Sequence, residues 1–208
     1  MVIDLRRCAG CQTCTIACKQ EHSLPPGIFW RYVVDLEVGK YPDVRRSFLP
    51  MGCMHCGDPP CVPVCPTGAS KKREDGVVWI QHDLCVGCGY CAVACPYQAR
   101  HLIEDEQSYF LAPTPSETKT RDPERHGVMT KCTFCMHRLD KASGEGRPGI
   151  DPEFSPVCST SCIANAIQFG DLNNRDSVVC RLLKDHKAER LLEELGTDPS
   201  VYYITSDR

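Results

Sequence analysis

The sequence contains no run of about 18 apolar residues, the length at which a segment becomes a candidate membrane-spanning helix. Its formal net charge is only -3, so it offers no basic stripe of the kind that binds nucleic acid. The motifs of a P-loop and of an H-E-x-x-H metalloprotease are also missing. We therefore expect a soluble or peripheral protein whose chemistry does not come from any of these motifs.

Cysteine is the abundant residue type, with 17 copies among 208 residues. Secreted disulfide scaffolds are usually shorter, and their cysteines are not grouped in fours. Arg6-Arg7 resembles the start of a twin-arginine signal, but Cys8, Cys11 and Cys14 occupy the stretch where an apolar core should follow. We therefore interpret the cysteines as thiolate ligands of metal.

Sixteen of the cysteines form four groups, numbered here in chain order. The groups are Cys8-x2-Cys11-x2-Cys14-x3-Cys18, Cys53-x2-Cys56-x4-Cys61-x3-Cys65, Cys85-x2-Cys88-x2-Cys91-x3-Cys95, and Cys132-x2-Cys135 followed by Cys158-x3-Cys162. Group three, with Pro96 after it, matches the C-x2-C-x2-C-x3-C-P run of bacterial ferredoxins, and group one repeats its spacing. Zinc ribbons use paired C-x2-C motifs but not this third and fourth cysteine. The pattern favours 4Fe–4S clusters over zinc.

The spacing also predicts which cysteines share a cluster. In two-cluster ferredoxins, the fourth cysteine of each run binds the other cluster of the pair. Pairing group two with three, and one with four, predicts four 4Fe–4S clusters. The predicted ligand sets are Cys53, Cys56, Cys61 and Cys95; Cys85, Cys88, Cys91 and Cys65; Cys8, Cys11, Cys14 and Cys162; and Cys132, Cys135, Cys158 and Cys18. The sequence leaves a different partnering of the outer groups open.

Several other residues near the groups receive plainer interpretations. Cys180 has no partner motif and is expected to be a buried small hydrophobe. His55 lies between two cysteines and is expected to pack or to donate or accept a hydrogen bond rather than bind metal. Seven basic residues flank the groups, and each is either a solvated charge or a group that raises a cluster potential or guides a partner. They are Arg6, Arg7, Lys19, Lys71, Lys72, Arg100 and Lys131. The match of Gly144, Gly146 and Gly149 to a dinucleotide fingerprint follows no strand and is interpreted as chance.

Local patterns predict short elements around the groups. Strands are expected at Met1–Asp4, Val77–Ile80, Ala166–Phe169 and Val201–Ile204, surface loops at Ala112–Gly127 and Ser143–Asp151, and an amphipathic helix at Arg181–Leu195 ended by Gly196. An alanine recurs four positions after the last cysteine of three groups, as Ala69, Ala99 and Ala166. Gly68 and Asn165 precede two of these alanines and are expected to take positive φ in a tight turn.

The four-group pattern resembles the iron–sulfur subunit of the dimethyl sulfoxide reductase family of molybdopterin oxidoreductases. The markers are His55-Cys56 with Pro59-Pro60-Cys61, Cys65-Pro-Thr-Gly-Ala69, Cys88-Gly-Tyr-Cys91, Cys95-Pro-Tyr97 and Lys131-Cys-Thr-Phe-Cys135. The resemblance extends from Cys8 through Cys162, and includes the subunits of polysulfide, tetrathionate and arsenate reductases, sulfite dehydrogenase and phenylacetyl-CoA:acceptor oxidoreductase.

This resemblance implies an α+β fold of two pseudo-symmetric two-cluster ferredoxin-like units with long loop insertions. Residues 1–48 and 101–180 would form the outer unit and residues 49–100 the inner unit, with residues 181–208 as a C-terminal helix and tail used for docking. The implied partners are a molybdopterin-containing catalytic subunit and a membrane quinone-reactive subunit. Such a complex would lie at the inner membrane, on the cytoplasmic side, or on the periplasmic side if co-exported with a partner. The alternative is a free polyferredoxin that diffuses between donors and acceptors.

Overall fold

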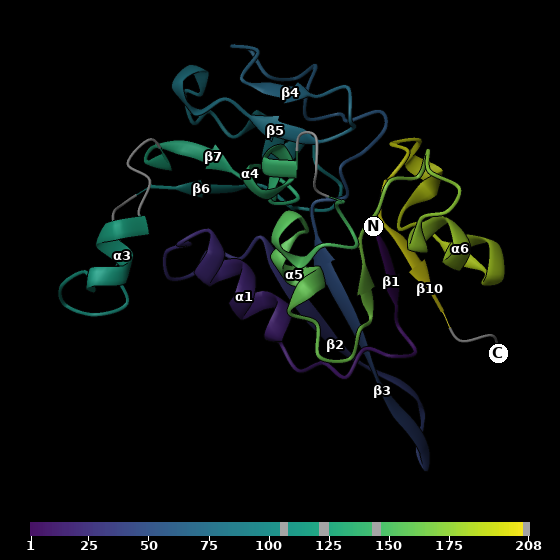
Figure 1. The fold of residues 1–208 in the computed structure, drawn as a ribbon. Helices are drawn as coiled ribbons and strands as arrows, with labels where there is room; N and C mark the ends of the chain where they lie inside the picture. Colours follow the sequence, from purple (N-terminus) through teal and green to yellow (C-terminus); the bar gives the residue numbers. More distant parts are fainter. Residues whose placement is uncertain (105–107, 121–124, 143–146, 206–208) are drawn as a thin grey trace.

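The computed structural model describes residues 1–104, 108–120, 125–142 and 147–205. It is an α+β protein of short elements joined by long loops (Figure 1). The strands are β1 Val2–Asp4, β2 Arg31–Lys40, β3 Asp43–Gly52, β4 Ser70–Lys72, β5 Val78–Ile80, β6 His101–Ile103, β7 Val128–Thr130, β8 Ile167–Gln168, β9 Ala188–Glu189 and β10 Tyr202–Ile204. The helices are α1 Thr13–Glu21, α2 Tyr90–Val93, α3 Pro115–Thr120, α4 Met136–Leu139, α5 Val157–Thr160 and α6 Val178–Asp185, and the short 3-10 turns are η1 His82–Leu84, η3 Asp140–Ala142, η4 Pro152–Phe154 and η5 Glu193–Leu195.

One sheet joins the first and last parts of the chain. Its strand order is β8-β1-β10-β9, and β1 runs parallel to β10 but antiparallel to β8. Apolar side chains of these strands, including Ile3, Ile167 and Tyr203, are buried in the main core together with cysteines from groups one, two and four. The expected strands at Met1–Asp4, Ala166–Phe169 and Val201–Ile204 are confirmed in slightly shorter form as β1, β8 and β10.

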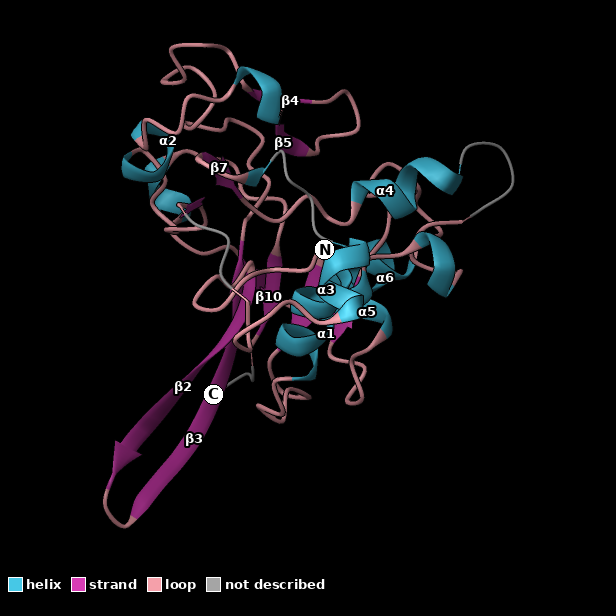
Figure 2. Ribbon diagram, turned by 90° about the vertical axis from the view of Figure 1, so that its left-hand side faces the viewer, coloured by secondary structure: helices cyan, strands magenta, loops and turns pink. Residues whose placement is uncertain are grey.

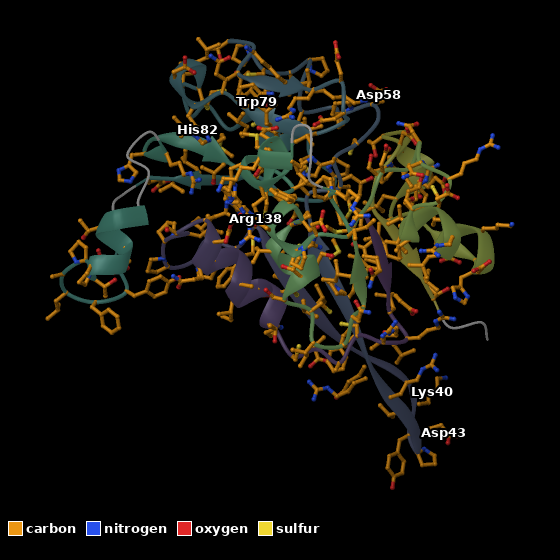
Figure 3. All side chains as sticks on the ribbon, in the orientation of Figure 1. Lys40, Asp43, Asp58, Trp79, His82 and Arg138 are labelled. Atoms are coloured by element: carbon orange, nitrogen blue, oxygen red, sulfur yellow. The ribbon has the colours of Figure 1, made fainter. Side chains whose placement is uncertain are left out.

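The hairpin formed by β2 and β3 extends away from the rest of the molecule (Figure 2). Lys40 and Asp43, labelled in Figure 3, flank its tip, where Tyr41 is 93% exposed. The sequence analysis did not predict this hairpin. Both faces of the outer half of the hairpin are open to solvent, so its strands carry charged residues such as Asp35 and Arg46 on either face. The alternation of apolar and polar residues that predicts a strand is therefore interrupted.

Each cysteine group except the first leads into a short strand through a left-handed turn. The expected positive φ is found at Gly68 (67°) and Asn165 (50°), and Gln98 takes the same conformation (51°) before Ala99. β4, β6 and β8 follow these turns. β4 pairs with β5, which confirms the expected strand at Val77–Ile80, and β6 pairs with β7.

Two expected elements differ from the structure. The helix expected at Arg181–Leu195 is wrong in its bounds, because α6 begins earlier and ends at Asp185. The hydroxyl of Ser177 caps its start by accepting the Cys180 N–H at 3.3 Å, and at its end His186 is extended (φ -134°, ψ 145°), so that β9 pairs with β10. Gly196, at φ 68°, ends the turn η5 rather than a helix.

The loop expected at Ala112–Gly127 is also wrong in part, because it contains α3. Thr114 and Glu117 form a reciprocal cap: the Glu117 N–H donates to Thr114 Oγ1 at 3.2 Å, and the Thr114 N–H donates to Glu117 Oε2 at 2.7 Å. Two short segments lie outside the described residues, namely 121–124 of this stretch and 143–146 of the expected loop Ser143–Asp151. The second segment contains Gly144 and Gly146 of the dinucleotide fingerprint. Among the described residues no helix has both the length and the apolar character to cross a membrane.

Candidate metal centres

Two sets of four cysteines each line an enclosed space. Cys53, Cys56, Cys61 and Cys95 line one, named site C here, together with Arg100 and Tyr97. Cys65, Cys85, Cys88 and Cys91 line the other, named site D, with Ala69 and Met129. In both spaces three sulfurs come from one group and the fourth from the last cysteine of the other group. These are the combinations that the sequence spacing predicts for groups two and three.

The remaining eight cysteines are named here by their predicted ligand sets. Site A is defined as Cys8, Cys11, Cys14 and Cys162, and site B as Cys18, Cys132, Cys135 and Cys158. Burial raises the pKa of the Cys8 thiol, and Cys162 and Cys11 are near enough to raise it further. Burial likewise raises the pKa of Cys18, and the thiols of Cys132, Cys158 and Cys135 are its neighbours. Helix α1, which carries Cys14 of site A and Cys18 of site B, packs against α5, which carries Cys158 of site B.

Glycine in the left-handed conformation shapes the loops of sites A and D. Gly10 and Gly87, at equivalent places in groups one and three, share a φ of 67°. A Cβ on Gly10 would lie 2.4 Å from the Phe48 ring, and one on Gly87 would lie 2.2 Å from the carbonyl oxygen of Gly127. The next helix then starts after a second left-handed residue, Gln12 before α1 and Gly89 before α2. The two copies of the unit therefore have the same local backbone path.

Hydrogen bonds to sulfur come from both backbone and side chains. The backbone N–H of Ala166 donates to Cys162 at 3.2 Å, and that of Ser70 donates to Cys65 at 3.5 Å. Arg100 Nη2 donates to Cys61 Sγ at 2.8 Å, and His22 Nε2 lies 3.3 Å from Cys135 Sγ. Donors of this kind stabilise negative charge on a sulfur ligand and raise the potential of an iron–sulfur cluster.

The burial of several cysteines disfavours free thiolates. Burial raises the pKa of Cys14 to about 11 and that of Cys56 to about 12, so these thiols stay protonated at neutral pH until a metal displaces the proton. Within the described residues no three His, Cys, Asp or Glu side chains converge closely enough to hold one metal ion. In sites C and D the four cysteines line a space instead, as the ligands of a cubane core must.

Solvent exposure differs between the sites. Sites A and D each contain one exposed cysteine, Cys11 and Cys88, whereas every cysteine of site B is less than a tenth exposed. Cys132 of site B lies near Cys53 of site C, and Cys158 of site B lies near Cys14 of site A. Cys61 of site C and Cys65 of site D are four residues apart. The sites are therefore neighbours in the order A, B, C, D, and the two that contain an exposed cysteine are A and D.

The other candidate residues take varied places. His55 stacks on Phe134 and accepts the Val78 N–H, so it packs and forms a hydrogen bond as expected. Cys180 belongs to none of the four sites and is only half-buried, less than expected, with its thiol donating to the Leu172 carbonyl at 3.3 Å. Among the basic residues, Arg6 pairs with Asp4, and Lys19 donates to the carbonyls of Pro25 and Ile28, whereas Arg100 and Lys131 are buried beside cysteines.

Two residues near sulfur were missed by the sequence analysis. Arg31 is 2% exposed, and its Nη2 lies 3.9 Å from Cys158 Sγ. His22 is buried against Trp30 and Cys135, and burial lowers its pKa to about 3, so its ring is neutral at physiological pH. Neither belongs to a cysteine motif. Both lie beside cysteines of group four that are more than 100 residues away in the sequence, so only the folded chain brings them to the sulfurs.

Comparison with known proteins identifies the metal centres. Two models described as 4Fe–4S dicluster domains match residues 1–66 and 44–112, and two dicluster domains imply four 4Fe–4S clusters. The chain is 41% identical to a subunit of the selenate reductase of Mesobacillus selenatarsenatis, over 99% of this chain and 71% of the relative. It is 40% identical to the iron–sulfur cluster-binding subunit of the menaquinone reductase of Nitratidesulfovibrio vulgaris (99% and 88%), and 36% identical to the arsenate respiratory reductase iron–sulfur subunit of Shewanella sp. (99% and 95%).

The matches to these relatives cover the whole length in which the cysteine groups and the glycine loops occur. The chain belongs to the family of iron–sulfur electron-transfer subunits that serve the molybdopterin oxidoreductases of the dimethyl sulfoxide reductase family.

Proposed function

We propose that the chain relays electrons through four 4Fe–4S clusters between a molybdopterin-containing catalytic subunit and a membrane quinone-reactive subunit. Sites A, B, C and D each hold one cluster through their four cysteines. When bound, each cluster accepts and releases one electron at a time. The chain contributes the thiolates, the hydrogen bonds to sulfur and the buried charge that surround each cluster. Support for the ligand sets comes from the cysteines that line sites C and D together.

The exposed apolar residues around the two end sites carry this proposal. Around site D, Val86 is 65% exposed, Tyr90 62% and Val93 90%. Around site A, Ile16 is 62% exposed and Ile163, directly after Cys162, is 75% exposed. α2, which carries Tyr90 and Val93, lies in a different part of the molecule from α1, which carries Ile16, and α5, which precedes Ile163 (Figure 2). Exposed apolar residues that gather beside a redox centre indicate a surface covered by another protein.

This distribution favours a subunit over the free polyferredoxin. A diffusing carrier is expected to present polar, wet surfaces at its redox centres, whereas apolar surfaces are typical of a permanent subunit, which covers them with its partners. Two such surfaces at the ends of one row of clusters suit a protein that receives electrons from one partner and delivers them to a second. Because the exposed cysteines Cys11 and Cys88 lie at these ends, the clusters there are also nearest to a partner.

The proposal includes the division into units. The outer unit consists of residues 1–48 and 101–180, the inner unit of residues 49–100, and the two are related by pseudo-symmetry. The shared φ of 67° at Gly10 and Gly87 supports this relation. Residues 181–208 add a docking surface, supported by the exposure of Leu192 (40%) and Leu195 (54%) beside η5. In the cell, we expect the chain to be peripheral to the inner membrane as part of the complex, on the cytoplasmic side unless co-exported.

Anaerobic purification with copurifying partners tests the proposal. Iron, sulfide, zinc and molybdenum are quantified, and about sixteen iron and sixteen sulfide per chain are expected, with molybdenum on a larger partner. Val93→Lys and Ile163→Lys place a charge on each end surface and are each expected to release one partner without loss of iron. Tyr41→Lys, at the equally exposed hairpin tip, is the matched control and retains both partners. Full iron content with no partner bound to any variant or to the wild type would favour a free carrier instead.

A further inference from the structure

Three cations are buried in the interior near the cysteines. Arg31 in β2 is 2% exposed, Arg100 before β6 is 6% exposed, and Lys131 after β7 is 2% exposed. Within the described residues no salt bridge joins any of them to a carboxylate. A buried charge without a counter-charge is strongly destabilising, so each of these residues needs a nearby negative group.

Arg31 lies between sites A and B. Its Nη2 lies 3.9 Å from Cys158 Sγ of site B and 3.2 Å from the Met1 sulfur, while its Nε has no hydrogen-bond partner among the described atoms. Burial alone would lower the pKa of Arg31, but Cys158, Cys132 and Cys14 are close enough to raise it when they are ionised. Cys14 belongs to site A and lies in α1, which packs against β2, so Arg31 is near cysteines of both sites.

Arg100 connects sites C and D through hydrogen bonds. Its Nη2 donates to Cys61 Sγ of site C at 2.8 Å, and its Nη1 donates to the Ser70 hydroxyl at 2.7 Å. The backbone N–H of Ser70 donates in turn to Cys65 Sγ of site D at 3.5 Å. One guanidinium and one serine therefore link a sulfur of one site to a sulfur of the next.

Lys131 occupies the remaining junction, between sites B and C. Its Nζ donates to the carbonyls of Val78 and of Cys132, the latter a member of site B. Val78 lines site C, so the ammonium group of Lys131 lies between residues of the two sites. Each junction in the row of sites thus contains one buried cation.

We propose that Arg31, Lys131 and Arg100 are the counter-charges of the clusters, each raising the reduction potentials of the two clusters on either side of its junction. This inference rests on the ligand sets proposed above. Four thiolates give every cluster a negative charge, and each one-electron reduction adds another. A cation fixed between two clusters, in a medium of low dielectric constant, stabilises the reduced form of both. Removing it shifts the potentials of two neighbours downward together.

The test compares Arg100→Gln with Arg100→Lys in the complete, anaerobically purified protein. Gln removes the charge but keeps an N–H donor, whereas Lys keeps the charge. Redox titration followed by electron paramagnetic resonance measures each cluster, and iron and sulfide are counted on the same samples. In Arg100→Gln we expect the reduction equilibria of clusters C and D to shift at least tenfold towards the oxidised form, about 59 mV for each one-electron couple. In Arg100→Lys the reduction equilibria of both clusters should stay within a few-fold of those of the wild type.

Lys72→Gln is the matched control, because it also removes one positive charge after group two, but Lys72 is exposed and only donates to the Gly57 carbonyl. Its clusters keep the wild-type potentials. Arg31→Gln repeats the measurement at the other end, with the shift confined mainly to clusters A and B. Fully loaded Gln variants with unshifted potentials would overturn the inference and leave the four-cluster proposal intact.

The same two variants also test the inference if one of them fails to assemble its clusters. If Arg100→Gln loses iron while Arg100→Lys retains it, a positive charge is required to hold the clusters, which supports the inference. Loss of iron from both variants would mean that the shape of the guanidinium matters and not its charge, and the inference would be rejected. A wild-type protein that lacks about sixteen iron atoms under anaerobic conditions would instead refute the underlying ligand sets.

Discussion

The imidazole of His55 stacks on the ring of Phe134, with ring centroids 3.7 Å apart and planes inclined by 17°. His55 belongs to group two and Phe134 to group four, so this contact joins the loops of sites C and B. The His55 Nδ1 accepts the buried N–H of Val78 at 3.1 Å, and the side chain is 1% exposed. One residue between two cysteines thus holds three distant segments together.

Replacement of His55 should therefore destabilise the loaded protein. His55→Ala loses the stack and leaves the Val78 N–H buried without a partner, at a cost of about 3 kcal/mol. His55→Asn retains an acceptor near the position of Nδ1 and should recover about 1 kcal/mol of this loss. Anaerobic thermal unfolding at one scan rate, followed by cluster absorbance, measures the unfolding midpoints. These should fall in the order wild type, His55→Asn, His55→Ala. Equal midpoints for Asn and Ala would show that the hydrogen bond does not contribute.

The glycines of the cysteine loops should differ sharply in their tolerance of alanine. Gly10, Gly68 and Gly87 share a φ of 67°, where an L-residue costs about 1–2 kcal/mol. A Cβ on Gly68 would meet no atom within 4 Å, whereas one on Gly87 would meet the Gly127 carbonyl. We expect Gly87→Ala to lose about a quarter of its iron, corresponding to the cluster of site D, and Gly68→Ala to lose none. Similar iron contents in these two variants would contradict the steric argument.

The contrast between local and distant features explains what the sequence could predict. The left-handed turns at Gly68 and Asn165 were predictable because a few neighbouring residues determine them. The end of α6 was not, because pairing of β9 with β10 prevents residues 188–189 from continuing a leucine-rich helix. Arg31 was missed for a related reason: its side chain reaches Cys158 only through the unpredicted β2–β3 hairpin, 127 residues away in the sequence.

Cys180 should be dispensable for cluster binding. It lies in α6, and its thiol donates to the Leu172 carbonyl rather than lining any of the four sites. Cys180→Ala is expected to retain full iron and sulfide content, with a loss of stability of about 1 kcal/mol from the missing packing and hydrogen bond. Cys162→Ala is the paired variant and should lose the cluster of site A. Iron lost from Cys180→Ala would assign the seventeenth cysteine to a site.

The ion pair between α1 and α4 predicts that Glu21 stays ionised and stabilises the fold well below neutral pH. Arg138 donates to both carboxylate oxygens of Glu21, through Nε at 2.5 Å and Nη2 at 2.7 Å, and His137 Nε2 lies 2.7 Å from the same carboxylate. Hydrogen bonding from Arg138, opposed by partial burial and helped by His137, lowers the Glu21 pKa to about 2, against about 4.3 in an unfolded protein. A lowered carboxyl pKa stabilises the fold fully above the unfolded value and loses that effect only as pH falls towards 2.

Glu21→Gln should therefore destabilise the protein at both pH 6 and pH 8, because the carboxylate stays ionised at both values. Solvent screens the pair, so the expected loss is about 1 kcal/mol, equivalent to a fall of about 2–4 °C in the unfolding midpoint. The measurement is anaerobic thermal unfolding at both pH values, with Arg138→Met and the double variant completing a cycle. The two single variants should have similar effects, and the double variant should be little worse than either. A difference between Glu21→Gln and wild type that disappears at pH 6 would mean that Glu21 titrates near neutrality, contrary to a carboxylate held by Arg138.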